Sequence, residues 1–72
     1  MKMADYTITG TLKDWKIEHR QGNKYVLNGK IYNDIRNRFL DGTEITTSRL
    51  LSIEFEDGIA YTKNSIYKLE NN

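Results

Sequence analysis

Apolar and polar side chains alternate at every second position along most of this chain, and this pattern limits the fold more than any other feature. The stretch YTITGTLKDWKIEHR, for example, places Trp15 and Ile17 on one face and Lys16 and Glu18 on the other. Alternation is typical of β-strands, whose successive side chains point to opposite faces of a sheet. Helical periodicity is hard to find anywhere in the sequence. We therefore predict an all-β protein.

Turn sequences divide the alternating pattern into five or six strands. QGNK, DIRN, EDG and TKNS each contain glycine, asparagine or aspartate, which favour turns. In YVLNGKIYN the pattern turns Leu27 and Ile31 inward, and Gly29 shares their parity, where close packing or a bend could require glycine. The outward positions hold Asn28, Lys30 and Tyr32. Gly10 is expected to mark a β-bulge in the long first strand.

Asp41 and Gly42 give the strongest hairpin signal in the chain. A type I′ turn needs positive φ at both central residues, which an Asp-Gly pair supplies readily. We expect a tight hairpin here, between strands over residues 38–40 and 43–47. The next expected strand, LLSIEFED, has a single face formed by Leu51, Ile53 and Phe55. IYKLE is the last expected strand.

Short turns between five or six strands predict an antiparallel meander closed into a small SH3-like or OB-like barrel. At 72 residues there is length for a single domain, residues 1–72, whose core is too small for comfortable stability. With no cysteine and one histidine, disulfides and a structural metal are not at hand. We therefore expect a homo-oligomer, and no cofactor.

The N-terminal sequence and the charge suggest a cytoplasmic protein without a membrane partner. MKMADYTITG lacks the apolar run of a signal peptide, and no stretch reaches about 20 apolar residues. The net charge of +1 gives no general attraction to nucleic acid. Residues 13–38 nevertheless carry seven basic against three acidic side chains, and residues 39–72 three against six. One end could therefore meet an anion or the other end of a neighbouring subunit.

We predict no enzyme, no catalytic residue and no metal site. His19, the sole histidine, lies between charged neighbours on an expected strand, which is typical of an exposed position rather than a catalytic base. Glu54 and Glu56 share a strand face, where two carboxylates more commonly protect a solvated edge than perform acid–base chemistry. Neither metal-ligand spacing nor a phosphate-binding glycine loop is present.

Binding chemistry is more plausible. RNRFLDGTEITTSR gathers guanidinium and hydroxyl groups around the expected hairpin, and these groups suit a phosphate, although a plain hairpin explains the same residues. Asn64 and Ser65 could likewise satisfy a turn or meet a base edge. The tyrosines that could stack on a base, or equally pack in the core or an interface, are Tyr32, Tyr61 and Tyr67. Trp15 is assigned to the core.

At GKIYNDIRNRFLDGTEITTS and TKNSIYKL the sequence resembles a widespread family of small phage and prophage proteins. Their pattern is G-x-I/V-Y-x-D, then R-F-x-D-G-T-x-I-x-T-S, then T-x-N-S-x-Y-x-L, and it covers residues 29–48 and 62–69 here. This chain departs from it at Asn37 and Thr46, where relatives often have glycine and histidine. The resemblance implies a phage counter-defence sponge (anti-CBASS), which sequesters a cyclic nucleotide immune signal of the host without cleaving it. Such sponges are homo-oligomers with pockets between subunits.

The resemblance also suggests which residues bind the ligand. The motif positions carried over are Arg38, Phe39, Asp41, Gly42, Thr43, Thr47, Ser48, Thr62, Asn64, Ser65 and Tyr67. The candidate ligand-binding residues among them are Arg38, Thr43, Thr47, Ser48, Asn64, Ser65 and Tyr67. Arg38 would pair with a phosphate, Thr47 and Ser48 would complete the anion contacts, and Asn64 and Tyr67 would meet the base. Phe39 is expected in the core and Gly42 in turn geometry.

Two other functions stay open. A sheet edge or a tyrosine-rich face could make the chain a protein-interaction module that inhibits a host protein. KDWKIEHRQGNK combines basic residues and one aromatic residue on a strand, as in single-stranded nucleic-acid binders, but it also carries Asp14 and Glu18. Nucleic acid is therefore the less favoured partner.

Overall fold

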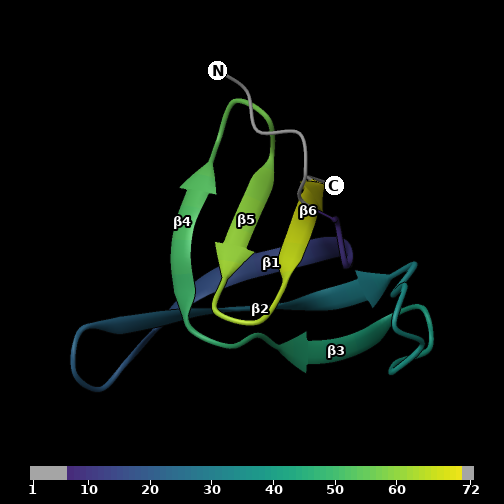
Figure 1. Ribbon diagram of the computed structural model, residues 1–72. Coiled ribbons are helices and arrows are strands. Elements are labelled where there is room, and N and C mark those ends of the chain that lie inside the picture. Colours follow the sequence, from purple (N-terminus) through teal and green to yellow (C-terminus); the bar gives the residue numbers. More distant parts are fainter. Residues whose placement is uncertain (1–6, 71–72) are drawn as a thin grey trace.

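The computed structural model describes residues 7–70, which contain six β-strands and no helix. The strands are β1 (Gly10–Arg20), β2 (Lys24–Tyr32), β3 (Thr43–Thr46), β4 (Leu50–Glu54), β5 (Ile59–Thr62) and β6 (Ile66–Glu70). They form one sheet in the order β3-β2-β1-β6-β5-β4 (Figure 1). The predicted all-β class is confirmed. Over the same residues there is no helix with the length and hydropathy of a membrane span.

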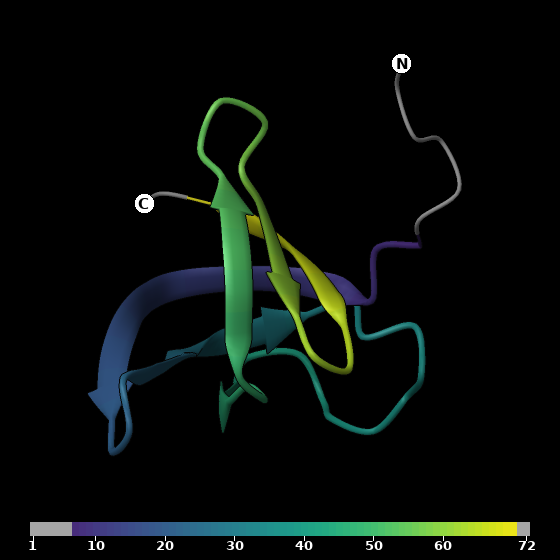
Figure 2. The same ribbon diagram turned by 60° about the vertical axis from the view of Figure 1, so that its left-hand side comes forward.

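The sheet differs from the predicted closed antiparallel meander in two ways. β1 and β6 pair in parallel, with Gly10 opposite Tyr67, whereas all other neighbouring strands are antiparallel. The sheet is also not closed into a barrel, because no pairing joins β3 to β4 in the described chain. The first and last strands meet at the centre of the sheet, which leaves β3 and β4 as its edges. The sheet bends strongly, so that β4 contacts β2 across the bend (Figure 2).

The core lies inside this bend, and its centre is formed by β1 and β2. Leu12, Leu27 and Ile31 are fully buried, which confirms the inward positions predicted on the second strand. The rest of the core cluster is Ile45, Ala60, Tyr67 and Leu69, with Trp15, Leu50 and Ile53 packed against it. A Cβ at Gly29 would lie 3.0 Å from Cβ of Trp15, so close packing is what requires this glycine.

The irregularity of β1 lies at Asp14, so the prediction of a bulge at Gly10 is wrong. The register between β1 and β2 shifts between Lys13 and Lys16, and Asp14 has a φ of 52°. A Cβ at Gly10 would lie 3.2 Å from Cδ1 of Ile31, and this close approach is a different reason for glycine there. Past the bulge the β1–β2 hairpin extends beyond the other strands (Figure 1). Ile17 lies in this extension, on the same face of β1 as Trp15, and is 44% exposed.

The predicted type I′ hairpin at Asp41 and Gly42 is also wrong. Residues 38–40 form no strand, and β3 pairs with β2 instead. Of Asp41 and Gly42, only Gly42 has a positive φ, of 89°, and the Thr43 N–H donates to the Leu40 carbonyl at 3.1 Å. A turn with glycine at its third position follows the type II pattern. The residues before it belong to a loop that is organised by Asp34.

The expected face of LLSIEFED forms only in part. Ile53 packs against the core, but Leu51 is 60% exposed and Phe55 is 74% exposed. The pairing of β4 with β5 shifts register between Leu50 and Ser52, which interrupts the alternation, and β4 ends at Glu54 before Phe55 is reached. Two large apolar side chains are therefore left on an edge strand and the turn that follows it.

Candidate ligand-binding site

The loop between β2 and β3, residues 33–42, is built around the buried carboxylate of Asp34, whose side chain is 1% exposed. The backbone N–H groups of Arg38, Phe39 and Arg36 donate to it at 2.8, 3.2 and 3.2 Å. The Arg38 guanidinium adds bonds from Nε and Nη2, each of 3.3 Å. Because five donors converge on one carboxylate, the loop cannot extend into the strand expected at residues 38–40.

Asp34 and Arg38 stabilise each other's charged form. Burial acts to raise the pKa of Asp34, but hydrogen bonds from the Arg38 side chain and from the backbone of Arg38 and Arg36 outweigh it. The pKa of Asp34 therefore lies below its ordinary value. Hydrogen bonds to Tyr67 and Asp34 raise the pKa of Arg38. Arg38 thus serves the loop, with its charge compensated by its own chain.

Phe39 is part of the same loop. The prediction that it lies in the core is wrong. It is 37% exposed, and its ring lies 5.1 Å from the guanidinium carbon of Arg38. Its backbone N–H is fixed by Asp34, which holds the residue at the surface.

Arg36, two residues before Arg38, is held very differently. Its Nη1 donates to Ser65 Oγ at 3.1 Å, and its Nη2 donates to the Asn64 carbonyl at 3.2 Å. Both acceptors are neutral, and Arg36 forms no ion pair within residues 7–70. A guanidinium has five N–H donors, so these two bonds leave others for an anion.

The turn between β5 and β6 gives Arg36 a fixed support. Thr62 Oγ1 accepts the Ser65 N–H at 3.1 Å and donates to the Ser65 carbonyl at 2.8 Å. Ser48 Oγ accepts the Asn64 N–H at 3.1 Å, which ties the turn to the segment that joins β3 to β4. Thr62 and Ser65 are both buried. The two groups that orient the guanidinium are thus themselves held in place.

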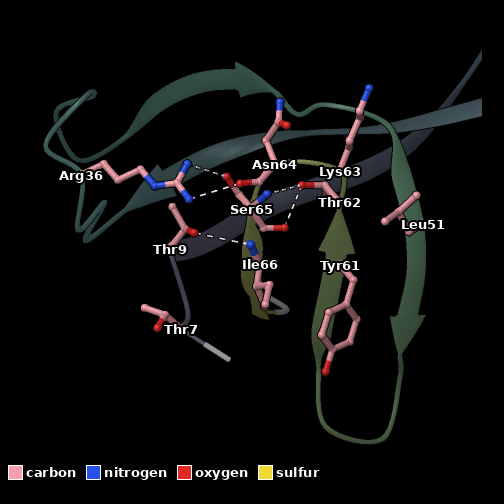
Figure 3. Close-up of a pocket in the computed structure, with 10 residues that line it drawn as sticks. All are labelled: Thr7, Thr9, Arg36, Leu51, Tyr61, Thr62, Lys63, Asn64, Ser65 and Ile66. Atoms are coloured by element: carbon pink, nitrogen blue, oxygen red, sulfur yellow. Dashed lines mark hydrogen bonds between the residues drawn. The ribbon is translucent and has the colours of Figure 1, made fainter. Parts of the chain in front are cut away.

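An open pocket of about 340 Å³ lies beside this turn. Its lining is Thr7, Thr9, Arg36, Leu51, Tyr61, Thr62, Lys63, Asn64, Ser65 and Ile66. Figure 3 shows Arg36 reaching toward Asn64 and Ser65, while the Lys63 side chain points away from the Tyr61 ring. None of these lining residues is acidic. The pocket therefore combines one oriented guanidinium with hydroxyl groups and an apolar wall.

The structure brings three of the predicted site residues together at this pocket or next to it. Asn64 and Ser65 line it, and Ser48 supports the turn from outside. Arg38 belongs to the Asp34 loop, and Tyr67 lies in the core with an exposure of 3%.

Thr43 and Thr47 were predicted to bind the ligand, but their hydroxyl groups form hydrogen bonds with backbone groups of this chain. Thr43 Oγ1 donates to the Leu40 carbonyl at 2.7 Å. Thr47 is buried, and its Oγ1 accepts the Leu27 N–H at 3.0 Å and donates to the Ser48 carbonyl at 2.8 Å. Both hydroxyls therefore maintain the fold of this protomer.

Arg36 belongs to the stretch RNRFLDGTEITTSR, which the sequence marks as suited to a phosphate, but it is not among the predicted ligand-binding residues. The spacing Asp34-x-Arg36-x-Arg38 places two arginines within four residues of one carboxylate, so their charges can be compensated unequally and one of them left without a carboxylate partner. This was the available signal. It does not say which arginine is left, because that depends on the path of the loop.

Two of the four lysine and arginine side chains in residues 13–24, the stretch considered for nucleic acid, form ion pairs, and Lys30 forms a third pair with Asp14 of that stretch. The ion pairs are Lys13–Glu70 at 3.6 Å, Arg20–Glu18 at 3.5 Å and Lys30–Asp14 at 3.7 Å. A hydrogen bond from Asn28 and the charge of Arg20 lower the pKa of Glu18. Within residues 7–70 no three metal-ligating side chains gather.

Comparison of the chain with models of known protein families, with curated proteins and with solved structures gives no significant match. The geometry of the pocket and the sequence resemblance are thus the basis for a functional proposal.

Proposed function

We propose that this protein is a non-enzymatic binder of a cyclic di- or oligonucleotide, which it holds at the Arg36 pocket. The observation that carries the proposal is the Arg36 guanidinium, which is oriented by Ser65 and Asn64 yet has no carboxylate partner in the described chain. A guanidinium in a fixed position, with free donors, suits a phosphodiester. Arg38 was the expected phosphate ligand, but its charge is already compensated by Asp34.

The remaining lining suits the rest of a nucleotide. Tyr61, Leu51 and Ile66 provide apolar surface for a base or a ribose, and the Asn64 side chain is exposed and carries amide groups that can meet a base edge. Ligand pockets span about 300–1,000 Å³. At about 340 Å³ this one is near the lower limit, so one protomer would enclose part of a cyclic dinucleotide. A second copy would cover the rest, as in a pocket between subunits.

The biological role that we propose follows from the resemblance of residues 29–48 and 62–69 to phage proteins. A phage-encoded sponge acts in the host cytoplasm, where it lowers the free concentration of a cyclic nucleotide signal. This role needs tight binding and no chemical step. It therefore needs a rigid pocket rather than a general base or nucleophile.

The proposal is tested by isothermal titration of the folded protein with a panel of cyclic di- and trinucleotides. We expect micromolar or tighter binding of one of them, and a loss of roughly 10- to 100-fold in affinity for Arg36→Ala. Arg20→Ala, an exposed arginine on the β1–β2 hairpin, is the matched control and should bind normally. Absence of binding by the whole panel would contradict the proposal.

A complementary experiment requires no choice of ligand. The protein is purified from cells that express a cyclic-oligonucleotide synthase, denatured, and searched by mass spectrometry for a released nucleotide.

A single-stranded oligonucleotide serves as the competing ligand in the titration. Its binding, with an affinity that falls steeply with salt, would favour the nucleic-acid alternative instead.

A further inference from the structure

The free edge of β4 is the least protected surface of the sheet. β4 is the last strand in the order, and its outer edge has no partner within residues 7–70. It contains neither proline nor lysine, the residues that commonly block edge-to-edge pairing. Leu51 on this strand and Phe55 just after it are 60% and 74% exposed. Such an edge favours addition of another strand.

Two hollows lie beside β4 and have different linings. Leu51 lines the Arg36 pocket. Ile53 and Phe55 line a second hollow of about 170 Å³, together with Trp15, Gly58 and Leu69. Leu69 is part of the core and Trp15 and Ile53 pack against it, so the core reaches the surface at this second hollow. A partner along β4 would therefore cover apolar surface as well as backbone.

The charges along β4 are arranged with opposite signs at its two ends. Arg49 precedes the strand, and Lys63 lies next to it, since the Lys63 N–H donates to the Arg49 carbonyl at 2.9 Å. Glu54, Glu56 and Asp57 lie at the other end. None of these five side chains takes part in an ion pair among the described residues.

We infer that a second copy of this chain docks antiparallel along the β4 edge, about a twofold axis near Ser52. In this arrangement the basic end of each strand meets the acidic end of the other, so the surface is complementary to itself. Leu51 and Ile53 flank Ser52 in the strand and thus lie near the axis. The same surface of a twofold dimer serves both subunits, which is why a second copy fits better than an unrelated partner.

The other edge of the sheet does not offer these features. β3 has four residues, and its largest apolar side chain, Ile45, is buried in the core. Glu44 and Thr46, the alternate positions, are exposed and polar. β4 is therefore the edge that favours association.

The position of Leu51 connects the dimer to the ligand site. Leu51 lines the Arg36 pocket, so the second copy would lie beside that pocket. This part of the inference rests on the proposed function, whereas the dimer itself does not require a ligand.

Sedimentation velocity over a range of protein concentrations, without ligand, tests the inference. We expect a dimer, and a dissociation constant at least about tenfold weaker for Arg49→Glu and for Glu56→Arg, since each reversal places like charges together. The double variant Arg49→Glu/Glu56→Arg exchanges the two ends and should restore the dimer. Glu44→Arg on the β3 edge is the matched control and should leave the dimer unchanged.

Phe55→Ser provides a second test that does not depend on charge. Phe55 is 74% exposed in the protomer, so the variant should fold normally, as judged by circular dichroism, and dimerise more weakly. A monomer at all concentrations, or a dimer that is insensitive to both single charge reversals, would overturn the inference. A dimer that binds no nucleotide would contradict the proposed function alone, and a nucleotide-binding monomer would contradict the dimer alone.

Discussion

Arg36 and Arg38 lie two residues apart in one loop, but the structure gives them different surroundings. Arg38 meets the buried carboxylate of Asp34 at 3.3 Å, and its charge stabilises the loop. Arg36 meets only a hydroxyl and a carbonyl oxygen at the 62–65 turn, at the rim of an open pocket. The comparison shows that the position of the counter-ion, rather than the presence of arginine, separates a structural cation from one that can bind a ligand.

The largest effect should come from Asp34→Asn. An amide cannot accept all the hydrogen bonds that the carboxylate accepts, and it leaves Arg38 without its counter-ion. We expect the largest fall in melting temperature of any substitution considered. Asp41→Asn is the matched control, because Asp41 is exposed in the same loop and accepts one hydrogen bond, from the Asn33 N–H. If both variants melt alike, Asp34 is not the organiser of the loop.

Acid should act on the same interaction. The pKa of Asp34 is lower in the folded protein than its ordinary value of 3.8, so its contribution to stability is fully present above pH 3.8. That contribution should be lost as the pH falls from there through the folded-state value. Urea unfolding between pH 7 and pH 2 measures it. Asp34→Asn should show a shallower acid loss than the wild type, and an identical loss in both would contradict this.

Thr47→Val separates a structural hydroxyl from a ligand-binding one. The substitution keeps the shape but leaves the Leu27 N–H without the Thr47 acceptor, and we expect a loss of about 1–3 kcal/mol in the free energy of unfolding. Thr46→Val on the exposed side of β3 is the control: it removes a hydrogen bond to Asn28 Oδ1 whose partners water can reach, so the expected change is about 0.5 kcal/mol or less. Normal stability with weakened nucleotide binding would instead support the original assignment of Thr47 to the ligand.

The smallest effect on stability should come from Arg36→Ala. Its side chain is exposed and bonds neutral groups, so the free energy of unfolding should change by about 0.5 kcal/mol or less. Arg38→Ala should destabilise the protein more than this, because it removes the partner of a buried carboxylate. Equal losses in chemical denaturation would remove the distinction between the two arginines.

Much of the fold could be predicted from the period-2 pattern, because burial imposes it directly. Leu27 and Ile31 are buried as the alternation requires, and Gly29 packs against Trp15. The parallel pairing of β1 with β6 could not be predicted, since strands that are distant in sequence leave no local sign of their pairing. The Asp-Gly signal failed for a different reason: Asp34, several residues earlier, binds the backbone that would have formed the hairpin strand.

The candidate site could be predicted less completely than the fold. TKNS was identified as either a turn or a binding segment, and the structure places Asn64 and Ser65 in a turn that also lines the pocket. The residue types alone were enough to identify the segments that carry the polar groups of the site. They could not distinguish Arg36 from Arg38, because that depends on which side chain reaches a buried carboxylate in the folded loop.

The most direct measurement follows the two arginine Nε–H signals in ¹H–¹⁵N spectra during titration with a cyclic dinucleotide. We expect the Arg36 signal to shift as the ligand binds, while the Arg38 signal stays in place because its Nε–H already donates to Asp34. A shift of Arg38 with no change at Arg36 would show that the pocket cation has been assigned to the wrong residue.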